Sequence, residues 1–595
     1  MCRNLSHRLL YLRLIAILSI CLTAPAARSL PETIDSAQVP QLPQNSPLPQ
    51  LPPPQDILPS PPSPSPTPLP SPDAPLPPPE DLLQSPTQPP PDEETPVGTY
   101  LVNITVEKFE FIGNTAFSSQ KLAEITKPFT NRPISFAELL QARTAVTEFY
   151  INQGYITSGA LIPADQTIQG GVVTIQVVEG GLEGIKISGT RRLNPNYVRS
   201  RLAVATSKPL NQERLLEALQ LLQLNPLIAN LSAELSAGSR PGLSLLEVRV
   251  TEAKTFSTQI GIDNGRSPSV GSFRRRLQVN EANLFGLGDG LSIAYSNTDG
   301  SDSFDTSYTI PINPYNGTLS VSYGTTSSDV IEPPFDRLDI YAASRYYELT
   351  LRQPIVQTPS QEFTVGLTAS RRESETSLLE IPFPLSAGAD DEGRTRISAL
   401  RFFQEWTRTG SREVIALRSQ FNIGLGAFDA TINESAPDSR FYSWQGQAQW
   451  VRLLAPETLL LVRGNVQLAD RTLVPLEQFG LGGLESVRGY RQDVLLTDNG
   501  VLLSAELQYP VLRVPQVQGV LQIIPFVDFG TAWNSSGRED PDPNRLLSVG
   551  LGLQWRQSPR FSARLDWGIP LVNLSSRERT WQENGLYFSV QYNPF

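Results

Sequence analysis

Two residues of this chain stand out as candidates for polar chemistry, because each is a single charge in a glycine-rich or apolar setting. Arg488 follows a stretch that contains Gly480, Gly482 and Gly483, and Asp528 lies 40 residues further on. An arginine keeps its charge at any ordinary pH, and an isolated ion in an apolar setting is costly unless it is paired. We therefore predict that Arg488 and Asp528 form an ion pair.

The side chains that most enzymes and metal sites need lie in one short amino-terminal segment. Residues 1–26 have the pattern of a cleaved secretory signal, with a positively charged start, an apolar core and small residues at 24–26. The only histidine, His7, and both cysteines, Cys2 and Cys21, fall inside it. After cleavage, a thiol nucleophile, a disulfide, a structural zinc site and a Ser-His-Asp triad would each lack an essential side chain. We predict no enzymatic activity, no cofactor and no metal. A membrane anchor is the alternative for this segment, but its apolar run is short and interrupted.

The net charge and the hydropathy of the chain limit its possible partners and its possible cellular locations. The net charge is −11 at pH 7, which argues against nucleic acid as a partner. After the signal, no window offers about 18 consecutive apolar residues, the length of a membrane-spanning helix. An exported chain without such a helix is either a soluble periplasmic or secreted protein or a membrane β-barrel.

A proline-rich segment separates the signal from the rest of the chain. Proline fixes φ and donates no backbone hydrogen bond, so we predict a disordered or polyproline-II-like linker over 27–102. A solvated spacer is the favoured interpretation, and a ligand for a partner is the alternative.

A duplication follows the linker. The apolar-x-apolar-x-Gly pattern of 109–113 recurs at 185–189, an offset of 76 residues. A helix is predicted to begin at Ser135, where Glu138 completes a capping box, and its counterpart begins at Asn211, also 76 residues later. Each unit then closes on a strand that ends in an acid, Glu179 in the first and Glu252 in the second. The sequence therefore predicts two α+β units, 103–180 and 181–253, with the order β-α-α-β-β.

From residue 254 onward, the sequence pattern changes to short runs with apolar residues at every second position. Leu291–Ser296, Leu319–Tyr323 and Leu460–Leu468 are examples. Apolar residues facing lipid and polar residues facing a wet lumen give this period of two in a membrane barrel. A soluble sandwich would alternate too, but the polar faces with Arg and Gln, the aromatics and the number of segments favour a transmembrane antiparallel β-barrel over 254–595.

Several of these motifs resemble one known family. The segments 153–163 and 170–180 are similar to the first POTRA domain of haemolysin secretion/activation proteins, the ShlB/FhaC/HecB family of TpsB transporters in two-partner secretion. The loop residues Val487, Arg488, Gly489 and Tyr490 resemble the VRGY loop of this superfamily, and Phe526, Asp528 and Gly530 resemble its FxDxG strand. The resemblance implies 16 barrel strands, two periplasmic POTRA domains, and a loop over 480–490 whose arginine meets the strand's acid inside the barrel.

The resemblance also implies a function, which we state as an expectation. An outer-membrane pore would secrete an unfolded haemolysin- or haemagglutinin-like exoprotein without nucleotide, after its POTRA domains capture that client, and the lumenal loop would gate passage. Open strand edges can pair with an extended client. We expect these edges in 172–178 and 243–250, around the apolar residues Val173, Ile175, Val177, Leu245 and Val248.

Further partners and alternatives follow from the same resemblance. Outer-membrane lipid and the barrel-assembly machinery are expected partners, and the POTRA domains and the proline-rich segment are expected in the periplasm. A barrel-assembly or protein-import factor of the same superfamily is the first alternative, and a passive porin is the second. Two departures stand out: the region before 103 offers no convincing plug helix, and Phe595 is out of phase with the alternation of 586–592.

Overall fold

The structure is a computed structural model that describes residues 82–84 and 104–595, except 165, 167, 169, 241, 536, 537 and 575–579. The predicted signal at 1–26 and the predicted linker, apart from 82–84, lie outside the described residues.

The first α+β unit is built on a three-stranded sheet in the order β3-β6-β5, with a separate β2-β4 pair. Alternate side chains of β3 and β6 point into one core, where they meet one face of helix α5. The predicted capping box is present at the start of this helix: Ser135 and Glu138 exchange hydrogen bonds between side chain and backbone. The elements are β2 (Ile104–Val106), β3 (Lys108–Ile112), α4 (Ser119–Thr126), η1 (Lys127–Phe129), β4 (Arg132–Ile134), α5 (Phe136–Asn152), β5 (Gly159–Leu161) and β6 (Val172–Val178).

The second unit has the same order of strand, two helices and two strands. Asn211 caps the second helix as predicted, and Leu215, Leu219 and Leu222 are buried against the sheet. The elements are β7 (Gly181–Ser188), α6 (Pro195–Ala205), α7 (Gln212–Gln223), β8 (Ile228–Ala237) and β9 (Leu243–Glu252).

The acid at the end of each unit's last strand has a structural role. Glu179 accepts hydrogen bonds from the backbone N–H groups of Thr115 (2.6 Å) and Ala116 (2.7 Å) and from the Tyr150 hydroxyl (3.0 Å). Glu252 accepts in the same way from the backbone N–H groups of 191–193. The acid therefore holds the turn that follows β3 in the first unit and the turn that follows β7 in the second.

Strand order corrects the prediction about open edges. In the two sheets, β6 lies between β3 and β5, and β9 lies between β8 and β7. β9 is paired on both sides over 244–249, whereas β5 pairs with only the last three residues of β6, 176–178. The predicted client-binding residues on them point into the cores: Val173, Ile175, Val177 and Val248 are buried and Leu245 is half-buried. The expectation of a free strand edge is therefore wrong for 244–249, whereas on β6 the described residues 172–175 lack a strand partner on the β5 side.

The prediction of a wholly disordered linker is also wrong for the few linker residues that the structure describes. Leu83–Gln84 forms a short strand, β1, beside β8. Leu82 and Leu83 are buried in the core of the second unit.

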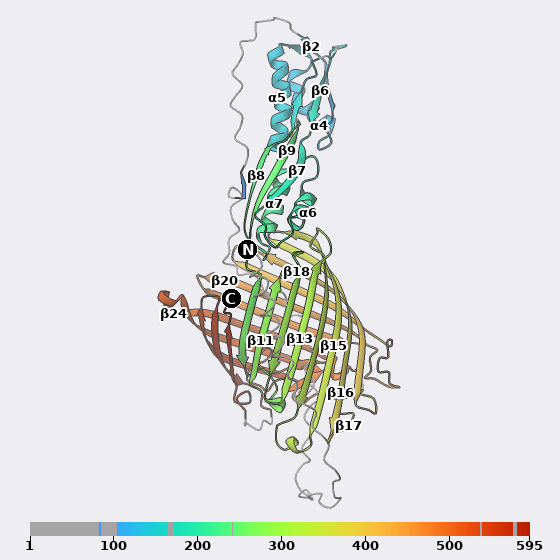
Figure 1. The fold of residues 1–595 in the computed structure, drawn as a ribbon, viewed down its shortest axis with the longest axis vertical. Helices are drawn as coiled ribbons and strands as arrows, with labels where there is room; N and C mark the ends of the chain where they lie inside the picture. Colours follow the sequence, from blue (N-terminus) through green and yellow to red (C-terminus); the bar gives the residue numbers. More distant parts are fainter. Residues whose placement is uncertain are drawn as a thin grey trace, which may run out of the picture. The chain divides into compact units, whose positions relative to one another are not determined.

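The rest of the chain forms a closed antiparallel barrel of 16 long strands, as predicted, and the last strand pairs with the first. Figure 1 shows these strands tilted around the barrel. A short strand, β17 (Ile381–Pro382), folds back on the end of β16. The strands are β10 (Phe256–Asp263), β11 (Arg274–Ala282), β12 (Gly290–Asn297), β13 (Ser301–Pro311), β14 (Thr318–Asp329), β15 (Ile340–Thr358), β16 (Gln361–Leu378), β18 (Arg394–Thr409), β19 (Glu413–Leu425), β20 (Tyr442–Ala455), β21 (Thr458–Ala469), β24 (Asn499–Val514), β25 (Gly519–Trp533), β26 (Arg545–Gln557), β27 (Phe561–Pro570) and β28 (Leu586–Tyr592).

The two edges of the barrel differ in their connections. Because the number of strands is even, β10 begins and β28 ends at the same edge, which we call the near edge. The near-edge connections are short, such as 359–360 and 456–457. Apart from 298–300, the far-edge connections are longer, and the longest runs from 470 to 498.

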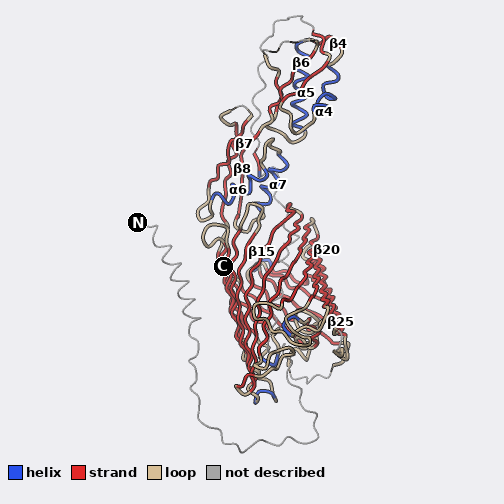
Figure 2. Tube along the Cα trace, turned by 90° about the vertical axis from the view of Figure 1, so that its right-hand side faces the viewer, coloured by secondary structure: helices blue, strands red, loops and turns tan. Residues whose placement is uncertain are grey.

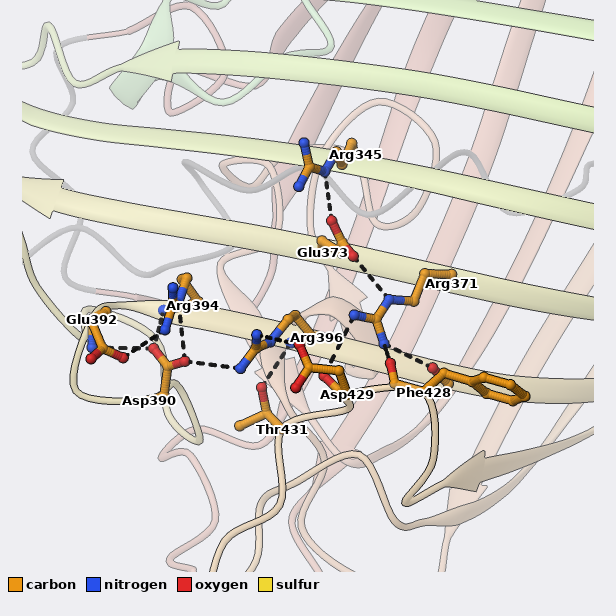
Figure 3. A network of polar contacts seen from close by, with 11 residues as sticks. Arg345, Arg371, Glu373, Asp390, Glu392, Arg394, Arg396, Phe428, Asp429 and Thr431 are labelled. Carbon is orange, nitrogen blue, oxygen red and sulfur yellow. Dashed lines mark hydrogen bonds and ion pairs between the residues drawn. The ribbon is translucent and has the colours of Figure 1, made fainter.

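The outer surface of the barrel carries an apolar belt with a charged margin. On β15, Leu349 and Leu351 are 48% and 44% exposed on the outer face. Nearer the far edge, the same face of β15, β16 and β18 carries charged residues, drawn in Figure 3. Arg345 pairs with Glu373 at 2.5 Å, and Arg396 pairs with Asp429 of the connection 426–441 at 2.6 Å. Three neighbouring strands thus change from apolar to charged toward the same edge, as expected where a lipid-facing surface ends.

Helices are confined to the α+β units, apart from short 3-10 turns in connections, as Figure 2 shows for the described residues. Among those residues, no helix has both the length and the apolar character that a membrane crossing requires.

Glu179→Gln should destabilise the first α+β unit. Burial raises the pKa of the Glu179 carboxyl, but the hydrogen bonds from Ala116, Thr115 and Tyr150 outweigh it and hold that pKa below the ordinary value of 4.5. The carboxylate therefore stabilises the fold above pH 4.5, and this contribution is lost as the pH falls through the folded-state pKa. We expect a loss of about 1–3 kcal/mol at pH 7, measured by hydrogen–deuterium exchange of α5 in the full-length protein.

Glu110→Gln is the matched control, because Glu110 lies on the exposed side of β3. It should leave the exchange of α5 unchanged. Equal exchange in Glu179→Gln and the wild type at neutral pH would contradict the assigned role of Glu179.

Candidate functional site

The connection 470–498, which we call the latch, folds back into the barrel instead of extending from its far edge. It contains the 3-10 turn η4 (Pro475–Glu477) and a hairpin of β22 (Phe479–Leu481) and β23 (Leu495–Thr497). Gly482 and Gly483 turn the chain with φ of 110° and 104°. These values favour glycine, and a Cβ at Gly482 would lie 2.3 Å from the carbonyl oxygen of Arg491.

Arg488 is at the tip of the latch and is 1% exposed. Its guanidinium donates two hydrogen bonds to Asp528, from Nε at 2.8 Å and from Nη2 at 2.9 Å. Nη1 donates to Glu506 on β24 at 3.1 Å, and the backbone N–H of Arg488 donates to Asp528 at 3.1 Å. The structure therefore brings the two predicted residues together as a bidentate, charge-assisted pair, the strong form of such a contact.

The network continues beyond the predicted pair. Arg564 on β27 bonds Glu506 at 2.9 Å and Asp566 at 2.7 Å. The Asp566 carboxylate also lies 3.7 Å from Nη1 of Arg488, and Ser504 donates to Asp528 at 2.7 Å. Two guanidinium groups and three carboxylates thus occupy the inner wall of β24, β25 and β27, with little contact with water.

The FxDxG strand is β25, and its three motif residues share the inner face. Each of the three makes a different contact. Asp528 pairs with Arg488, and the ring of Phe526 lies beneath that guanidinium, 3.5 Å from centroid to Cζ. Gly530 leaves room for the latch, because a Cβ there would lie 2.8 Å from Leu481 and 3.1 Å from Val487. The motif therefore combines a charge, a cation–π surface and a close approach of two segments.

The neighbours of Arg488 hold the latch on the apolar side and at the last strand. Val487 is fully buried in a cluster with Leu481 and Leu546. The N–H of Gly489 donates to the Tyr587 hydroxyl of β28 at 3.1 Å, and that hydroxyl donates to the carbonyl of Tyr490. The Tyr490 hydroxyl donates to the carbonyl of Leu547 at 2.9 Å. The four VRGY residues thus contact the last five strands of the barrel.

A second anchor of the latch was not predicted from the sequence. Glu477 is buried and accepts hydrogen bonds from Arg401 of β18 at 2.6 and 2.9 Å and from Arg372 of β16 at 3.0 Å. The available signal was an acid just before the glycine-rich stretch and single arginines at inward positions of two strands. A water-filled lumen is lined by many such charges, so the strand register is needed to predict which of them pair.

The latch also contacts other far-edge connections. Arg491 pairs with Glu332 of 330–339 at 2.6 Å and donates to Ser269 of 264–273 at 2.7 Å. The latch residues Leu473, Val474 and Leu476 share a hydrophobic cluster with Phe335 and Phe441. The far-edge connections and the latch therefore form one packed layer.

The inner wall and the latch line an open polar cavity of about 620 Å³. Glu477 and Glu485 of the latch face it, with Arg276 and Gln445 among the wall residues. In the described part of the chain, no group of three or more His, Cys, Asp or Glu residues is arranged to hold a metal ion.

A closed barrel with an apolar outer belt, an α+β unit before it and a loop pinned inside by an arginine define an outer-membrane barrel of the POTRA-bearing class. The chain belongs to the family described as haemolysin secretion/activation protein ShlB/FhaC/HecB, whose profile matches residues 242–555. A ShlB-type POTRA profile matches residues 104–180, the first α+β unit.

Relatives and a solved structure agree with this assignment. The outer membrane transporter CdiB of Escherichia coli is 25% identical over 81% of this chain and 81% of its own length. The heme/hemopexin transporter protein HuxB of Haemophilus influenzae is 24% identical over 78% of this chain and 83% of its own. The solved structure of CdiB from Escherichia coli has a TM-score of 0.63 at 22% identity and covers 84% of this chain and 92% of that one.

A relative matched over less of its own length is named for a different function. The outer membrane protein assembly factor BamA of Nitratidesulfovibrio vulgaris is 22% identical over 72% of this chain but only 54% of its own length.

The family match and the transporter relatives show that the chain is an outer-membrane protein-secretion transporter with its POTRA domain in the periplasm. The near edge of the barrel is periplasmic and the far edge is extracellular.

Arg488→Ala should release the tip of the latch while the barrel remains assembled. Removing one partner of a buried charge network leaves carboxylates uncompensated and costs about 3–5 kcal/mol. We expect faster hydrogen–deuterium exchange over 479–497 in the full-length protein in nanodiscs, with the barrel strands still protected.

Arg513→Ala is the matched control, because Arg513 pairs with Glu457 in a contact where its side chain is 54% exposed. Such a pair contributes about 0–1 kcal/mol, and its loss should not alter exchange in the latch. Unchanged protection of 479–497 in Arg488→Ala would show that the charge network does not hold the latch.

Proposed function

We propose that this transporter secretes a separately encoded exoprotein, which crosses the barrel unfolded after the latch leaves the inner wall. The observation that carries the proposal is the buried Arg488 network. It fixes a folded segment inside the barrel through contacts between charges, and such contacts can be exchanged without breaking covalent bonds. A gating role for Val487, Arg488, Gly489, Tyr490 and Asp528 follows from it.

The names of two relatives support the choice of client. One curated relative is named a hemolysin transporter protein and another a heme/hemopexin transporter protein. By this likeness we propose a haemolysin- or haemagglutinin-like exoprotein as the cargo of this chain. We further propose that the unit 181–253 is a second POTRA domain, since it repeats the order of elements and the terminal-acid contact of the first.

The energy for transport is proposed to come from the client. A chain that folds on the extracellular side cannot return through the pore, so no nucleotide is required. We propose no catalytic role for the chain, and we propose that the barrel-assembly machinery inserts it, with outer-membrane lipid around the apolar belt. The alternative of a barrel-assembly factor is less well supported, because that relative is matched over little more than half its length.

Secretion should depend on this chain and on its first POTRA domain. We expect the exoprotein encoded beside it to reach the medium only from cells that make the transporter. Deletion of 104–180 should abolish secretion, because the client loses its periplasmic capture site, while heat-modifiable barrel remains in the outer membrane. The measurement is an immunoblot of medium and membrane fractions.

The deletion of 51–60 provides a control for a shortened periplasmic segment, and it should leave secretion intact. Full secretion without residues 104–180 would contradict capture by this domain. Secretion that is equal with and without the whole chain would contradict the proposed function.

A further inference from the structure

The two anchors of the latch have opposite polarity. At its tip the latch contributes the arginine, Arg488, and the wall contributes the carboxylates. At its start the latch contributes the acid, Glu477, and the wall contributes Arg401 of β18 and Arg372 of β16. When the latch leaves, the carboxylates at the tip site still have Arg564 beside them. Release therefore has a different consequence at the other anchor, where the wall carries the positive charges.

Arg401 loses its carboxylate partner together with the latch. Its two terminal nitrogens bond Glu477 at 2.6 and 2.9 Å. Its other partners are neutral, the hydroxyl of Ser370 at 3.1 Å and the amide oxygen of Asn422 at 3.1 Å. Within the described chain, no second carboxylate is in ion-pair contact with Arg401. A guanidinium that is 5% exposed is strongly disfavoured without a counter-ion, so the open lumen favours a replacement anion at this position.

Arg372 completes this binding site and sets its charge. It donates to Glu477 at 3.0 Å and to Glu348 of β15 at 3.3 Å. Both Arg372 and Arg401 donate to the same oxygen of Glu477, Oε1. After release, two arginines and Glu348 remain on the wall, a net charge of +1, which one carboxylate neutralises. Because the resident group is itself a carboxylate held between two guanidiniums, the geometry suits the side chain of a glutamate or an aspartate.

The site opens onto the space through which a client would pass. Arg372, Arg401 and Glu477 all line the polar cavity. Two further wall arginines, Arg276 and Arg463, line the same cavity. The Nε atoms of Arg372 and Arg463 have no hydrogen-bond partner among the described residues, so this wall has donors in excess while the latch is docked. A segment with acidic side chains is therefore the kind of chain that this wall complements.

We propose that Arg401 and Arg372 form a carboxylate-binding site on the translocation path, and that Glu477 is its resident occupant. An acidic side chain of the unfolded client replaces Glu477 when the latch leaves, so the latch and the client exchange one ion pair for another. The inference rests on the proposed function, since it requires a client inside the barrel. It assigns to that client an acidic residue in the segment that first enters the lumen.

Current block by an acidic peptide tests the site in the purified full-length transporter in planar bilayers. Glu477→Gln removes the resident acid and leaves both arginines on the wall. We expect a decaglutamate peptide, added on the periplasmic side, to block this variant at about tenfold lower concentration than the wild type, because the charge-assisted contacts become available to the peptide. A decaglutamine peptide should block neither protein.

Two further variants separate the site from a loosened latch. Glu477→Gln with Arg401→Gln removes both partners of the pair, which should preserve assembly, and it should lose the tenfold gain. Glu332→Gln is the matched control, because it frees the latch residue Arg491 from a 2.6 Å contact without freeing an arginine of the wall. It should be blocked like the wild type.

Three results would overturn the site: equal block of Glu477→Gln and the double variant, equal potency of the two peptides, or an equal gain in Glu332→Gln. If the double variant lacks heat-modifiable barrel, the comparison of Glu477→Gln with Glu332→Gln decides. In cells, the double variant should secrete the exoprotein more slowly than Glu477→Gln, and equal rates would overturn the exchange. The bilayer measurement uses no exoprotein, so failure of the proposed function is a separate result, in which the wild type itself secretes none.

Discussion

The interior of this barrel depends on one buried arginine and the three carboxylates around it. A guanidinium without water must find compensating charge, and the inner wall supplies it through Asp528, Glu506 and Asp566. The same carboxylates need Arg488 in turn, because Arg564 alone would compensate them incompletely. This mutual requirement gives the latch one favoured position, and the FxDxG strand is shaped to receive it. A second anchor, from Glu477 to Arg372 and Arg401, ties the start of the latch to another part of the wall.

The two anchors hold a folded segment inside the barrel at two separate parts of the wall. Between them the latch forms a short hairpin with three residue pairs, and the cavity beside it is polar. Under the proposed gating, release of the charge contacts would move this segment, while the barrel would keep its own ladder of hydrogen bonds.

Much of this arrangement could be predicted from the sequence, and the failures have physical causes. The caps at Ser135 and Asn211 mark helix starts because they act locally, and the single charges at 488 and 528 mark a pair because an apolar setting tolerates no other outcome. Glu477 could not be assigned in this way, because a wet lumen tolerates many charges and only strand register decides which of them meet. The free edge predicted on β9 was wrong because the central or edge position of a strand depends on pairing between distant segments. Leu82 and Leu83 were placed in a disordered linker because local composition favours disorder, whereas a tertiary core overrides it.

The central claim is that the latch leaves the wall during secretion, and a crosslink at the motif itself tests it most directly. A Cβ at Gly530 would lie 3.1 Å from Cγ2 of Val487, so Val487→Cys with Gly530→Cys has the close approach that a disulfide requires. We expect this disulfide to stop secretion of the exoprotein in cells, and we expect reductant to restore secretion by the same double variant. Secretion at the wild-type rate by fully crosslinked transporter would contradict the account.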